Sequence, residues 1–507
     1  MQLDQDLQSL QEMRRAVARA KEAQQKFESY SQEQVDRIVQ AMAEAAYNKA
    51  YDLAQMAVEE SGLGVIEHKA IKNQVASREV YQSIAEEKTV GVIRESREEN
   101  IVEVAAPFGV IAGIVPVTNP TSTAIFKSLT AVKARNAIVF SPHPSAAKCT
   151  VEAARICLQA AIQAGAPEGL IGWVSLPTME TTEALLKHRD VNLILATGGS
   201  GLVRAAYSSG KPAYGVGPGN VPVYIEKTAE VSLAVKRIVD SKTFDHGTIC
   251  ASEQSIVVDR NIREIVVREF KKHGAHFLTP EEKKKVEPVI SPSPGKLNPK
   301  IVGQSAKVIA RLAGIQVPEE TSLLIADETK VGKEIPFSIE KLAPVFAFYT
   351  VEGRNEAEMI CQRLLHLGGR GHSLALHTKD EELARSFAQN MPVSRILVNT
   401  PSALGAVGAT TKLKPSMTLG CGSFGGNITS DNVTARHLLN IKRLAYGVKD
   451  IDVPKAGMHH APPEQEPIMS ALQIEEVVEK VLAEARTLKS VNKESIATLV
   501  SQVVSKL

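Results

Sequence analysis

Val110-Ile111-Ala112-Gly113-Ile114-Val115 is a continuous run of small and apolar residues, and three further runs of the same kind follow it. They are Ala137–Phe140, Gly172–Ser175 and Leu193–Thr197, and Ala-rich segments of helical character separate them. A strand that is apolar on both faces is typical of a parallel sheet covered by helices on both sides. The sequence therefore predicts a parallel α/β region over residues 108–226, which binds ligands beyond the carboxyl ends of its strands.

The flanks of this region differ from it in pattern. Residues 1–90 carry apolar residues at helical spacing between charged positions, which predicts helices. The polar run 92–104 predicts an exposed hairpin. Residues 433–452 are expected to return along the chain and to form a strand near 443–452.

A second α/β region is predicted over residues 227–432. The runs that we interpret as its strands include Ser255–Val258, Val345–Tyr349 and Arg395–Val398. The composition then changes: residues 453–468 are rich in proline and predict a flexible linker. Residues 469–507 carry apolar residues at steps of three and four, which predicts a tail of two amphipathic helices.

Size, charge and cysteine content set limits on the function. A chain of 507 residues has room for two or three domains. A net charge of +2 gives no basis for nucleic-acid binding, and the longest apolar run is too short to cross a membrane. Five scattered cysteines are too few for a disulfide scaffold or a zinc knuckle, so we expect an intracellular protein with reduced thiols and no metal site.

Cys250 is the residue whose surroundings point to chemistry. It lies in Gly247-Thr248-Ile249-Cys250-Ala251-Ser252, a turn of small residues that leads into an apolar strand. Small neighbours leave space for a substrate to approach the thiol, whereas structural cysteines usually have bulky apolar neighbours. A reactive thiol and an inert buried one both fit this segment taken alone.

Three other segments end strands of the first region or follow them closely. Asn119, in Val115-Pro116-Val117-Thr118-Asn119-Pro120, has an amide that can donate to an oxyanion, although asparagine is also a common turn residue. Residues 197–203 form a glycine-rich turn that leads into a helix, and such turns bind phosphate through free N–H groups. Residues 215–222 form a tight loop just before the second region.

Two apparent motifs are rejected. Residues 420–425 match G-x-G-x-x-G literally, but neither a strand before them nor a helix after them is predicted. His246 is only four residues from Cys250, and the histidine of a Cys–His protease is normally distant in sequence.

Together these segments resemble the aldehyde dehydrogenase superfamily, and specifically its CoA-acylating branch. The resemblance covers about residues 10–450 and is most specific in Gly247–Gln254 and Val216–Pro222. It implies a Rossmann-like cofactor domain (1–226), an α/β catalytic domain with the thiol (227–432) and a small oligomerisation element. This element would combine the hairpin at 92–104 with the returning strand.

By this resemblance Cys250 attacks the aldehyde carbonyl to form a thiohemiacetal, which is oxidised to a thioester. Asn119 matches the side chain that stabilises the oxyanion, together with the backbone N–H of Cys250. His372, in Gly369-Arg370-Gly371-His372, matches a histidine of the acylating branch that orients or deprotonates the incoming thiol. A purely structural role for this loop histidine remains the alternative.

The departure at Gly215 is informative. Hydrolytic aldehyde dehydrogenases carry a glutamate at this position, where it activates water. Without that general base, hydrolysis loses a factor of about 10²–10⁴, whereas a thiol acceptor needs less help. The sequence therefore favours transfer of the acyl group to CoA.

The resemblance also implies NAD as cofactor and CoA as co-substrate. Glu340 matches the residue that holds the nicotinamide ribose. The strand end on the adenosine side has Ser141 where lysine is usual, and the acidic residue that disfavours NADP aligns near Pro144, so exclusion of NADP is left open. The full set of expected cofactor-binding residues is Ser141, Pro142, Thr197, Gly198, Gly199, Ser200, Gly201, Leu202, Val203, Gly217 and Glu340.

For the complete chain we expect oxidation of a short-chain aldehyde, acetaldehyde or propanal, by a homodimer or homotetramer in the cytoplasm. The tail 469–507 resembles encapsulation peptides that dock enzymes to bacterial microcompartment shells, and packing on the protein's own core is its alternative. Two other functions compete: a CoA-independent hydrolytic aldehyde dehydrogenase, and a non-catalytic shell adaptor that acts through its C-terminal tail.

Overall fold

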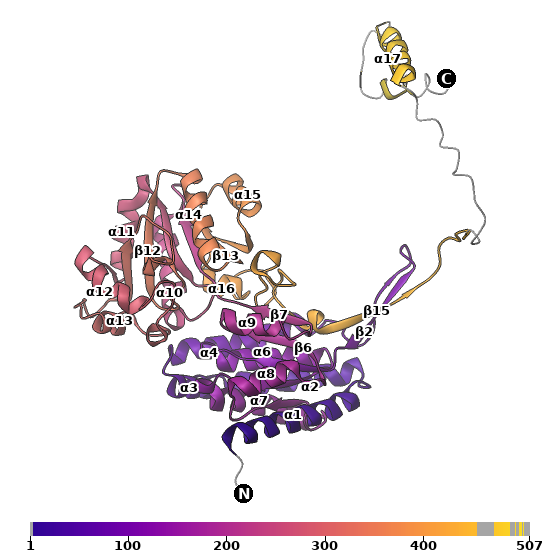
Figure 1. Ribbon diagram of the computed structural model, residues 1–507, viewed down its shortest axis with the longest axis horizontal. Helices are drawn as coiled ribbons and strands as arrows, with labels where there is room; N and C mark the ends of the chain where they lie inside the picture. Colours follow the sequence, from indigo (N-terminus) through magenta and orange to yellow (C-terminus); the bar gives the residue numbers. More distant parts are fainter. Residues whose placement is uncertain (1–3, 454–470, 487–491, 493–495, 499, 501–507) are drawn as a thin grey trace. The chain divides into compact units, whose positions relative to one another are not determined.

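The computed structural model describes residues 4–453, 471–486, 492, 496–498 and 500. The chain divides into two compact units, Met1–Ala445 and Tyr446–Leu507. The first unit contains two parallel sheets, which Figure 1 shows with their helices, and one small antiparallel sheet.

The first sheet has five parallel strands in the order β5-β4-β3-β6-β7. Its strands are β3 (Val110–Ile114), β4 (Ala137–Ser141), β5 (Ile171–Trp173), β6 (Val191–Thr197) and β7 (Ala213–Val216). The first strand in sequence lies at the centre and the order reverses there, so the topological switch point lies between β3 and β6. Ligands bind such sheets at that point, beyond the carboxyl ends of the strands.

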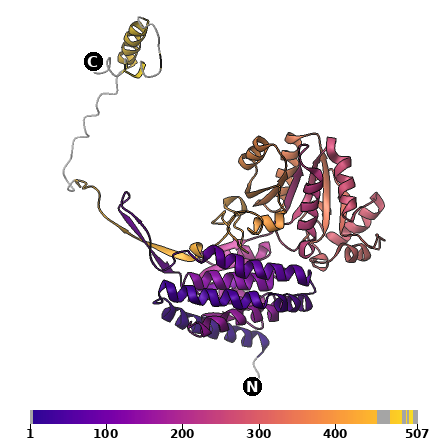
Figure 2. The same cartoon turned by 180° about the vertical axis from the view of Figure 1, so that it is seen from behind.

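Helices cover the five-stranded sheet, as Figure 2 shows from behind. They are α1 (Gln5–Phe27), α2 (Gln32–Asn48), α3 (Ala50–Ser61), α4 (Ile66–Gln74), α5 (Val80–Ile84), α6 (Pro120–Lys133), α7 (Ala147–Gln163), α8 (Met179–Lys187) and α9 (Ser200–Tyr207). A five-residue π-helical segment, Val75–Glu79, joins α4 to α5. Every residue of α6 is buried, as are β3 and β4, which explains why these segments lack a polar face.

The second sheet has seven parallel strands in the order β10-β11-β12-β9-β8-β13-β14. Its strands are β8 (Val221–Ile225), β9 (Glu253–Asp259), β10 (Ala275–Phe277), β11 (Leu323–Asp327), β12 (Val345–Val351), β13 (Gly371–His377) and β14 (Val393–Val398). Its helices are α10 (Val231–Thr243), α11 (Arg263–Lys272), α12 (Pro280–Ile290), α13 (Ala306–Leu312), α14 (Arg354–Leu367), α15 (Glu381–Asn390) and α16 (Ser402–Ala406).

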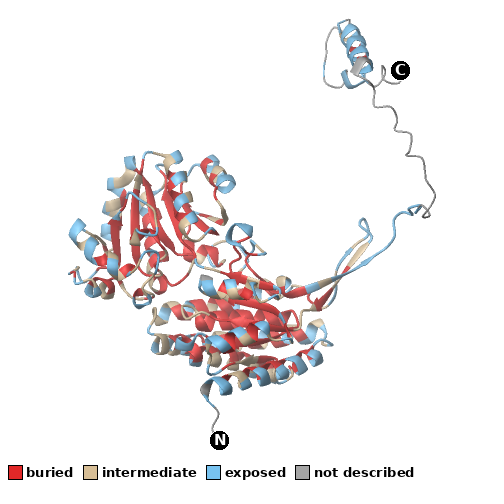
Figure 3. Ribbon diagram, in the orientation of Figure 1, coloured by how far each residue is buried: buried red, intermediate tan, exposed pale blue. Residues whose placement is uncertain are grey.

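Alternate residues of these strands pack into separate cores on the two faces. Ile256 and Val258 of β9 belong to one hydrophobic cluster, and Val257 between them belongs to another. Figure 3 shows the strands of both sheets as buried and the outer helix surfaces as exposed. The prediction of parallel α/β architecture is confirmed.

One predicted boundary needs correction. We expected the first domain to end at residue 226, but β8 pairs with β9 and β13 in the seven-stranded sheet. The chain therefore passes from one sheet to the other in residues 217–220. It returns between Leu419 and Val433, because Leu419 packs in a cluster with residues of β14 and α16, whereas Val433 packs in the core of the five-stranded sheet.

The small sheet is antiparallel, in the order β1-β2-β15. Its strands are β1 (Gly91–Ser96), β2 (Ile101–Pro107) and β15 (Leu439–Ala445). The hairpin at 92–104 lies in β1 and β2. The returning strand ends at Ala445 instead of extending to 452, because its partner β2 begins at Ile101, opposite Ala445.

The second unit contains α17 (Ala471–Ala485). Most of the predicted linker 453–468 lies outside the described residues. On α17, Val477 and Val481 are buried, while Ile474, Val478 and Leu482 are about half exposed. In the part of the chain that the structure describes, no helix is long and apolar enough to span a bilayer.

Candidate active site

A tight turn between α10 and β9 presents Cys250. Three successive residues, Asp245, His246 and Gly247, have φ angles of 49°, 51° and 74°. Left-handed backbone is uncommon outside glycine, and such strained turns gather at functional sites because surrounding contacts must hold them. The thiol at the end of this turn is partly exposed, although both neighbouring residues are buried.

A histidine faces this thiol. His372 lies at the start of β13, fully buried, with its Nε2 3.1 Å from Cys250 Sγ and its Nδ1 3.1 Å from Ser373 Oγ. Two glycines with left-handed backbone, Gly369 and Gly371, lead into it. We expected His372 to act on the incoming thiol; the structure places it against the protein's own thiol.

A buried guanidinium that we did not predict fixes the histidine. Arg395 on β14 donates to Ser373 Oγ (3.3 Å), to the carbonyl of His372 (3.2 Å) and to the carbonyl of Gly420 (2.7 Å). It thereby joins the start of β13 to the loop at 420–425. A single arginine in a predicted strand gave no signal of this role.

Burial determines the protonation of the Cys250–His372 pair. Burial raises the pKa of the Cys250 thiol to about 12, and the charge of Glu340 contributes to the rise. Burial lowers the pKa of His372 to about 3, and the nearby Arg395 adds to this effect. Near neutral pH the proton therefore stays on sulfur, and the pair is a thiol and a neutral imidazole, not an ion pair.

Alkylation of Cys250 should show this protonation state. Because the thiolate is the reactive form and its pKa is raised, we expect the rate with iodoacetamide to rise about tenfold per pH unit between pH 7 and 9, without a plateau. The measurement is the rate of mass increase at Cys250, with Cys250→Ala as background for the other cysteines. A plateau at or below pH 7 would contradict the prediction, since it would mean that a thiolate–imidazolium pair exists.

Asn119 lies at the N-terminus of α6, immediately before Pro120. Its amide Nδ2 donates to Thr118 Oγ1 at 3.1 Å and to the carbonyl of Thr248 at 3.4 Å, and its Oδ1 accepts from Lys72 Nζ at 2.6 Å. The amide nitrogen therefore faces the segment that leads to Cys250. A donor in this place is suited to stabilise an oxyanion formed beside the thiol.

Two buried lysines behind Asn119 are a second set of residues that we did not predict. Lys69 and Lys72 of α4 both contact the carboxylate of Asp245. Burial alone would raise the pKa of Asp245, but the charges of Lys72 and Lys69 bring it down to about 2. Burial lowers the pKa of Lys72 to about 8, against the effect of Asp245. On a helix of polar composition, lysines that face inward cannot be distinguished from surface lysines by sequence.

The crossing segment 217–220 lies against the backbone of Cys250. A Cβ on Gly219 would lie 2.2 Å from the carbonyl oxygen of Cys250, so only glycine allows this approach. The N–H of Gly219 donates to Glu340 Oε1 at 2.8 Å. Burial raises the pKa of Glu340 to about 7, although this hydrogen bond and two nearby lysines oppose the rise. Gly219 therefore links Glu340 to the backbone of Cys250.

The remaining predicted cofactor residues lie at strand ends of the five-stranded sheet. Thr197 ends β6, Gly198 and Gly199 follow it, and α9 begins at Ser200 and carries Gly201, Leu202 and Val203. Ser141 ends β4 and Pro142 follows. The Ser141 hydroxyl is buried and bonds Thr182 Oγ1 at 2.8 Å, so this side chain is turned into the protein.

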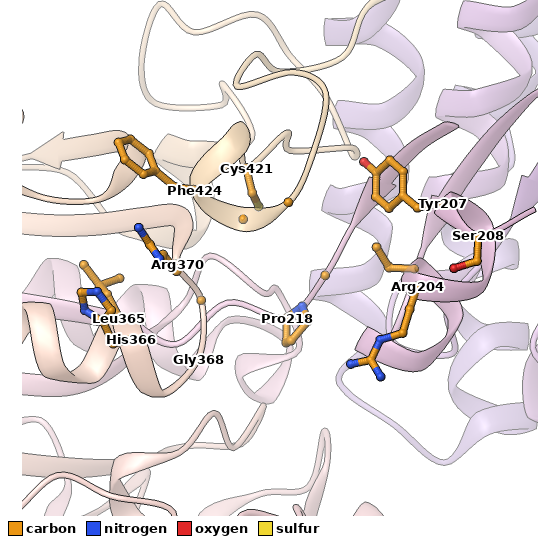
Figure 4. Close-up of a pocket in the computed structure, with 15 residues that line it drawn as sticks. Arg204, Tyr207, Ser208, Pro218, Leu365, His366, Gly368, Arg370, Cys421 and Phe424 are labelled. Carbon is orange, nitrogen blue, oxygen red and sulfur yellow. The ribbon is translucent and has the colours of Figure 1, made fainter. Parts of the chain in front are cut away.

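A cavity of about 450 Å³ opens beside these loops. Figure 4 shows Arg204 and Tyr207 of α9 and the following Ser208 on one side, Arg370 and Phe424 on the other, and Pro218 between them. Cys421, Phe424 and Gly425 of the rejected G-x-G-x-x-G segment line it as well, and that segment contains only a 3₁₀ turn, Ser423–Gly425, with no α-helix directly after it in the described part of the chain.

Comparison with known proteins agrees with this geometry. The sequence profile described as "Aldehyde dehydrogenase family" matches residues 5–416. The chain belongs to the aldehyde dehydrogenase family.

Three known aldehyde dehydrogenases are similar to this one. The bifunctional aldehyde-alcohol dehydrogenase AdhE of Escherichia coli (strain K12) is 51% identical over 439 residues, which are 86% of this chain and 49% of AdhE. The crystal structure of an acetylating aldehyde dehydrogenase from Geobacillus thermoglucosidasius is 56% identical, with a TM-score of 0.88 over 89% of this chain and 100% of that chain. A propionaldehyde dehydrogenase of Rhodopseudomonas palustris, with bound CoA and an acylated cysteine, is 29% identical, with a TM-score of 0.77 over 86% and 97% of the two chains.

The resemblance to the acylating branch of the family is therefore confirmed. The chain spans about half the length of the aldehyde-alcohol dehydrogenases that it matches.

The structure also explains why this chain has glycine at position 215. A Cβ there would lie 2.9 Å from Tyr207 Cε2 and 2.9 Å from Val203 Cγ1. Tyr207 cannot move aside freely, because its hydroxyl accepts from the N–H of Gly215 (3.0 Å) and donates to the carbonyl of Gly215 (3.2 Å). The place for a side chain at this position is already filled.

Proposed function

We propose that the chain oxidises a short-chain aldehyde, acetaldehyde or propanal, with NAD and transfers the acyl group to CoA. The observation that carries this proposal is the Cys250 thiol 3.1 Å from the His372 imidazole, in a site where position 215 has no room for a water-activating carboxylate. The similarity to an acetylating aldehyde dehydrogenase and to an enzyme with CoA and an acylated cysteine supports it.

Covalent catalysis would begin at Cys250. Its sulfur bonds to the aldehyde carbon as the thiol proton leaves through His372 Nε2, 3.1 Å away. Because the pKa of His372 is lowered to about 3, the imidazole passes this proton on to water and is neutral again before CoA reacts. The carbonyl oxygen becomes an oxyanion, to which Asn119 Nδ2 and the backbone N–H of Cys250 donate. A bound nicotinamide supplies the hydride acceptor that turns the thiohemiacetal into a thioester.

Transfer to CoA completes the cycle. The CoA sulfur attacks the thioester carbon, the bond to Cys250 breaks, and the CoA thiol proton returns through His372 to the Cys250 sulfur. One proton is released overall with each NADH formed. Water competes poorly, because position 215 has no room for the carboxylate that activates water in hydrolytic aldehyde dehydrogenases, whereas a thiol is the stronger nucleophile and needs less help.

The residues at the switch point fit a dinucleotide. The hydroxyl of Thr197 is buried without a hydrogen-bond partner among the described residues, and the positions next to the Cα atoms of Gly199, Gly201 and Gly217 open onto free space. Free N–H groups at the start of α9 suit the pyrophosphate, and Glu340 suits the nicotinamide ribose. The strand end at Ser141 carries no acidic side chain, so the choice of NAD over NADP is part of the proposal.

The test is the formation of NADH from propanal and NAD⁺, measured at 340 nm with and without CoA. We expect many turnovers with CoA, a single burst of at most one NADH per site without it, and no burst in Cys250→Ala. Equal sustained turnover without CoA would mean that water is the acceptor, and the hydrolytic alternative would hold.

We further propose that the enzyme is a homo-oligomer of the cytoplasm and that residues 469–507 direct it to a bacterial microcompartment shell. Pairing of β1, β2 and β15 into one small exposed sheet supports the first part. The half-exposed apolar positions Ile474, Val478 and Leu482 on α17 support docking of this helix on another protein. An inactive wild-type chain that still bound shell proteins would favour the non-catalytic adaptor instead.

A further inference from the structure

The helix α4 brings two lysine side chains into the interior next to the reacting groups. Lys69 and Lys72 are 2% and 3% exposed, and Asp245 between them is fully buried. Lys69 Nζ lies 2.9 Å from Asp245 Oδ2, and Lys72 contacts the same oxygen. Two cations share one carboxylate, so the cluster is not a neutral ion pair. Buried charge is costly, and this excess calls for a role beyond stability.

Lys72 donates hydrogen bonds to residues next to the reacting thiol. Besides Asp245, its ammonium donates to Asn119 Oδ1 at 2.6 Å and to Thr248 Oγ1 at 2.8 Å. An ammonium group has three N–H donors and no acceptor. All three are therefore engaged, and two of them hold the oxyanion donor and the segment two residues before Cys250.

This contact decides which way the Asn119 carboxamide points. Because Lys72 can only donate, the amide oxygen must face it and the NH₂ group must face the other side. There the NH₂ meets two acceptors, Thr118 Oγ1 and the Thr248 carbonyl. A flipped amide would place NH₂ against an ammonium and its oxygen against a carbonyl. The cation also draws electron density from the amide and strengthens its N–H groups as donors.

We propose that Lys72 is a positioning residue that holds Asn119 with its NH₂ group turned toward the oxygen of the aldehyde or thioester bound at Cys250. The inference rests on the proposed function, in which Asn119 donates to that oxygen. Lys72 itself does not touch the substrate. Its loss lets the carboxamide rotate, and the donor is then present only part of the time.

Lys69 provides a matched control on the same helix. It is equally buried and contacts the same carboxylate, but its other bond goes to the backbone carbonyl of Thr118 at 3.0 Å and not to the Asn119 side chain. Lys69→Met and Lys72→Met each remove one buried cation of the same size. Only Lys72→Met frees the amide of Asn119.

The experiment measures the rate of the NADH burst from propanal in the absence of CoA, which reports formation of the acyl-enzyme. Loss of one oxyanion donor typically costs about 10²–10³-fold, so we expect Lys72→Met to slow the burst about 100-fold and Lys69→Met less than tenfold. KM for NAD should stay within about twofold in both, since neither lysine lies at the cofactor residues. Thermal unfolding compares the folded state of each variant.

A double variant separates positioning from a general loss of structure. If Lys72 acts through Asn119, adding Lys72→Met to Asn119→Ala should slow the burst no further, because groups that act as a unit are not additive. Equal losses in the two methionine variants, or full multiplication of the losses in the double variant, would overturn the inference while the proposed function stands. A wild-type chain without a burst would overturn both.

If Lys72→Met does not fold, Lys72→Arg and Lys69→Arg replace the pair. Arginine keeps the charge on a longer, planar group that cannot reproduce the contact with Asn119. The burst should again be slowed at least tenfold more by the change at Lys72. Equal rates in these two variants would overturn the inference.

Discussion

Gly215→Glu is expected to lower CoA-dependent activity at least tenfold without creating a hydrolase. The new side chain must enter space that Tyr207 and Val203 occupy, both 2.9 Å from the Cβ position. Overpacking and a buried carboxylate together should lower the free energy of unfolding by about 3 kcal/mol or more. We expect CoA-dependent NADH formation to fall at least tenfold, and CoA-independent turnover to stay at the wild-type level. Both are measured at 340 nm, with thermal unfolding in parallel.

Two further variants test whether the effect comes from the space beside Gly215 that Tyr207 and Val203 occupy. Gly172→Ala on β5 of the same sheet places its Cβ at ordinary distances of 3.5 Å and more, so it should be near neutral. Tyr207→Ala combined with Gly215→Glu removes the obstructing ring and should recover part of the lost stability. Sustained CoA-independent turnover in Gly215→Glu alone would show that the carboxylate fits and that our account of this position is wrong.

Gly371→Ala should have a comparably large effect, through His372. Gly371 has a φ angle of 84°, and a Cβ there would lie 2.0 Å from the Cys421 carbonyl oxygen and 2.7 Å from the Gly425 N. Both obstacles are backbone atoms, so the start of β13 must shift. We expect a loss of about 2–5 kcal/mol in unfolding free energy. Since His372 is the next residue, a displacement near 1 Å should cost about 100-fold in kcat.

Gly210→Ala separates backbone strain from the clash at Gly371. Gly210 has a similar φ angle of 79°, but nothing lies within 4 Å of its Cβ position. It should cost about 1–2 kcal/mol and leave turnover nearly unchanged. Denaturant unfolding and steady-state kinetics measure both variants. Equal losses of stability and activity in the two would mean that the contact with the 421–425 loop is unimportant.

Much of the fold could be predicted because a strand that is buried on both faces has a recognisable local composition. Apolar runs without alternation indicated parallel sheets, and alternate residues of β9 do pack into different cores. The residue at which a strand ends was harder to predict from the sequence, because it depends on where the partner strand ends. The returning strand was expected near 443–452, yet β15 ends at Ala445, and Val448 and Ile451 beyond it are 71% and 73% exposed where no partner strand remains.

Within the site, predictable residues were those with unusual local sequence. Cys250 among small residues and Asn119 before a proline stood out, and the structure brings both into one site with His372 and Glu340. Lys72 and Arg395 did not stand out, because their roles come from contacts 47 and 23 residues away. The first contact joins two helices beside the five-stranded sheet, and the second joins neighbouring strands of the seven-stranded sheet. Both arise only when the chain folds, and composition carries no trace of them.

The chain connects the five-stranded and the seven-stranded sheet twice, at 217–220 and between Leu419 and Val433. These two connections are attachments that restrict how the sheets can move relative to each other more than a single connection would. Gly217 and Gly219 lie in one attachment, and the 421–425 loop that touches Gly371 lies in the other. The first attachment contacts the backbone of Cys250, and the second contacts the residue before His372. The distance between the thiol and the imidazole is therefore held by backbone contacts at both places where the chain changes sheets.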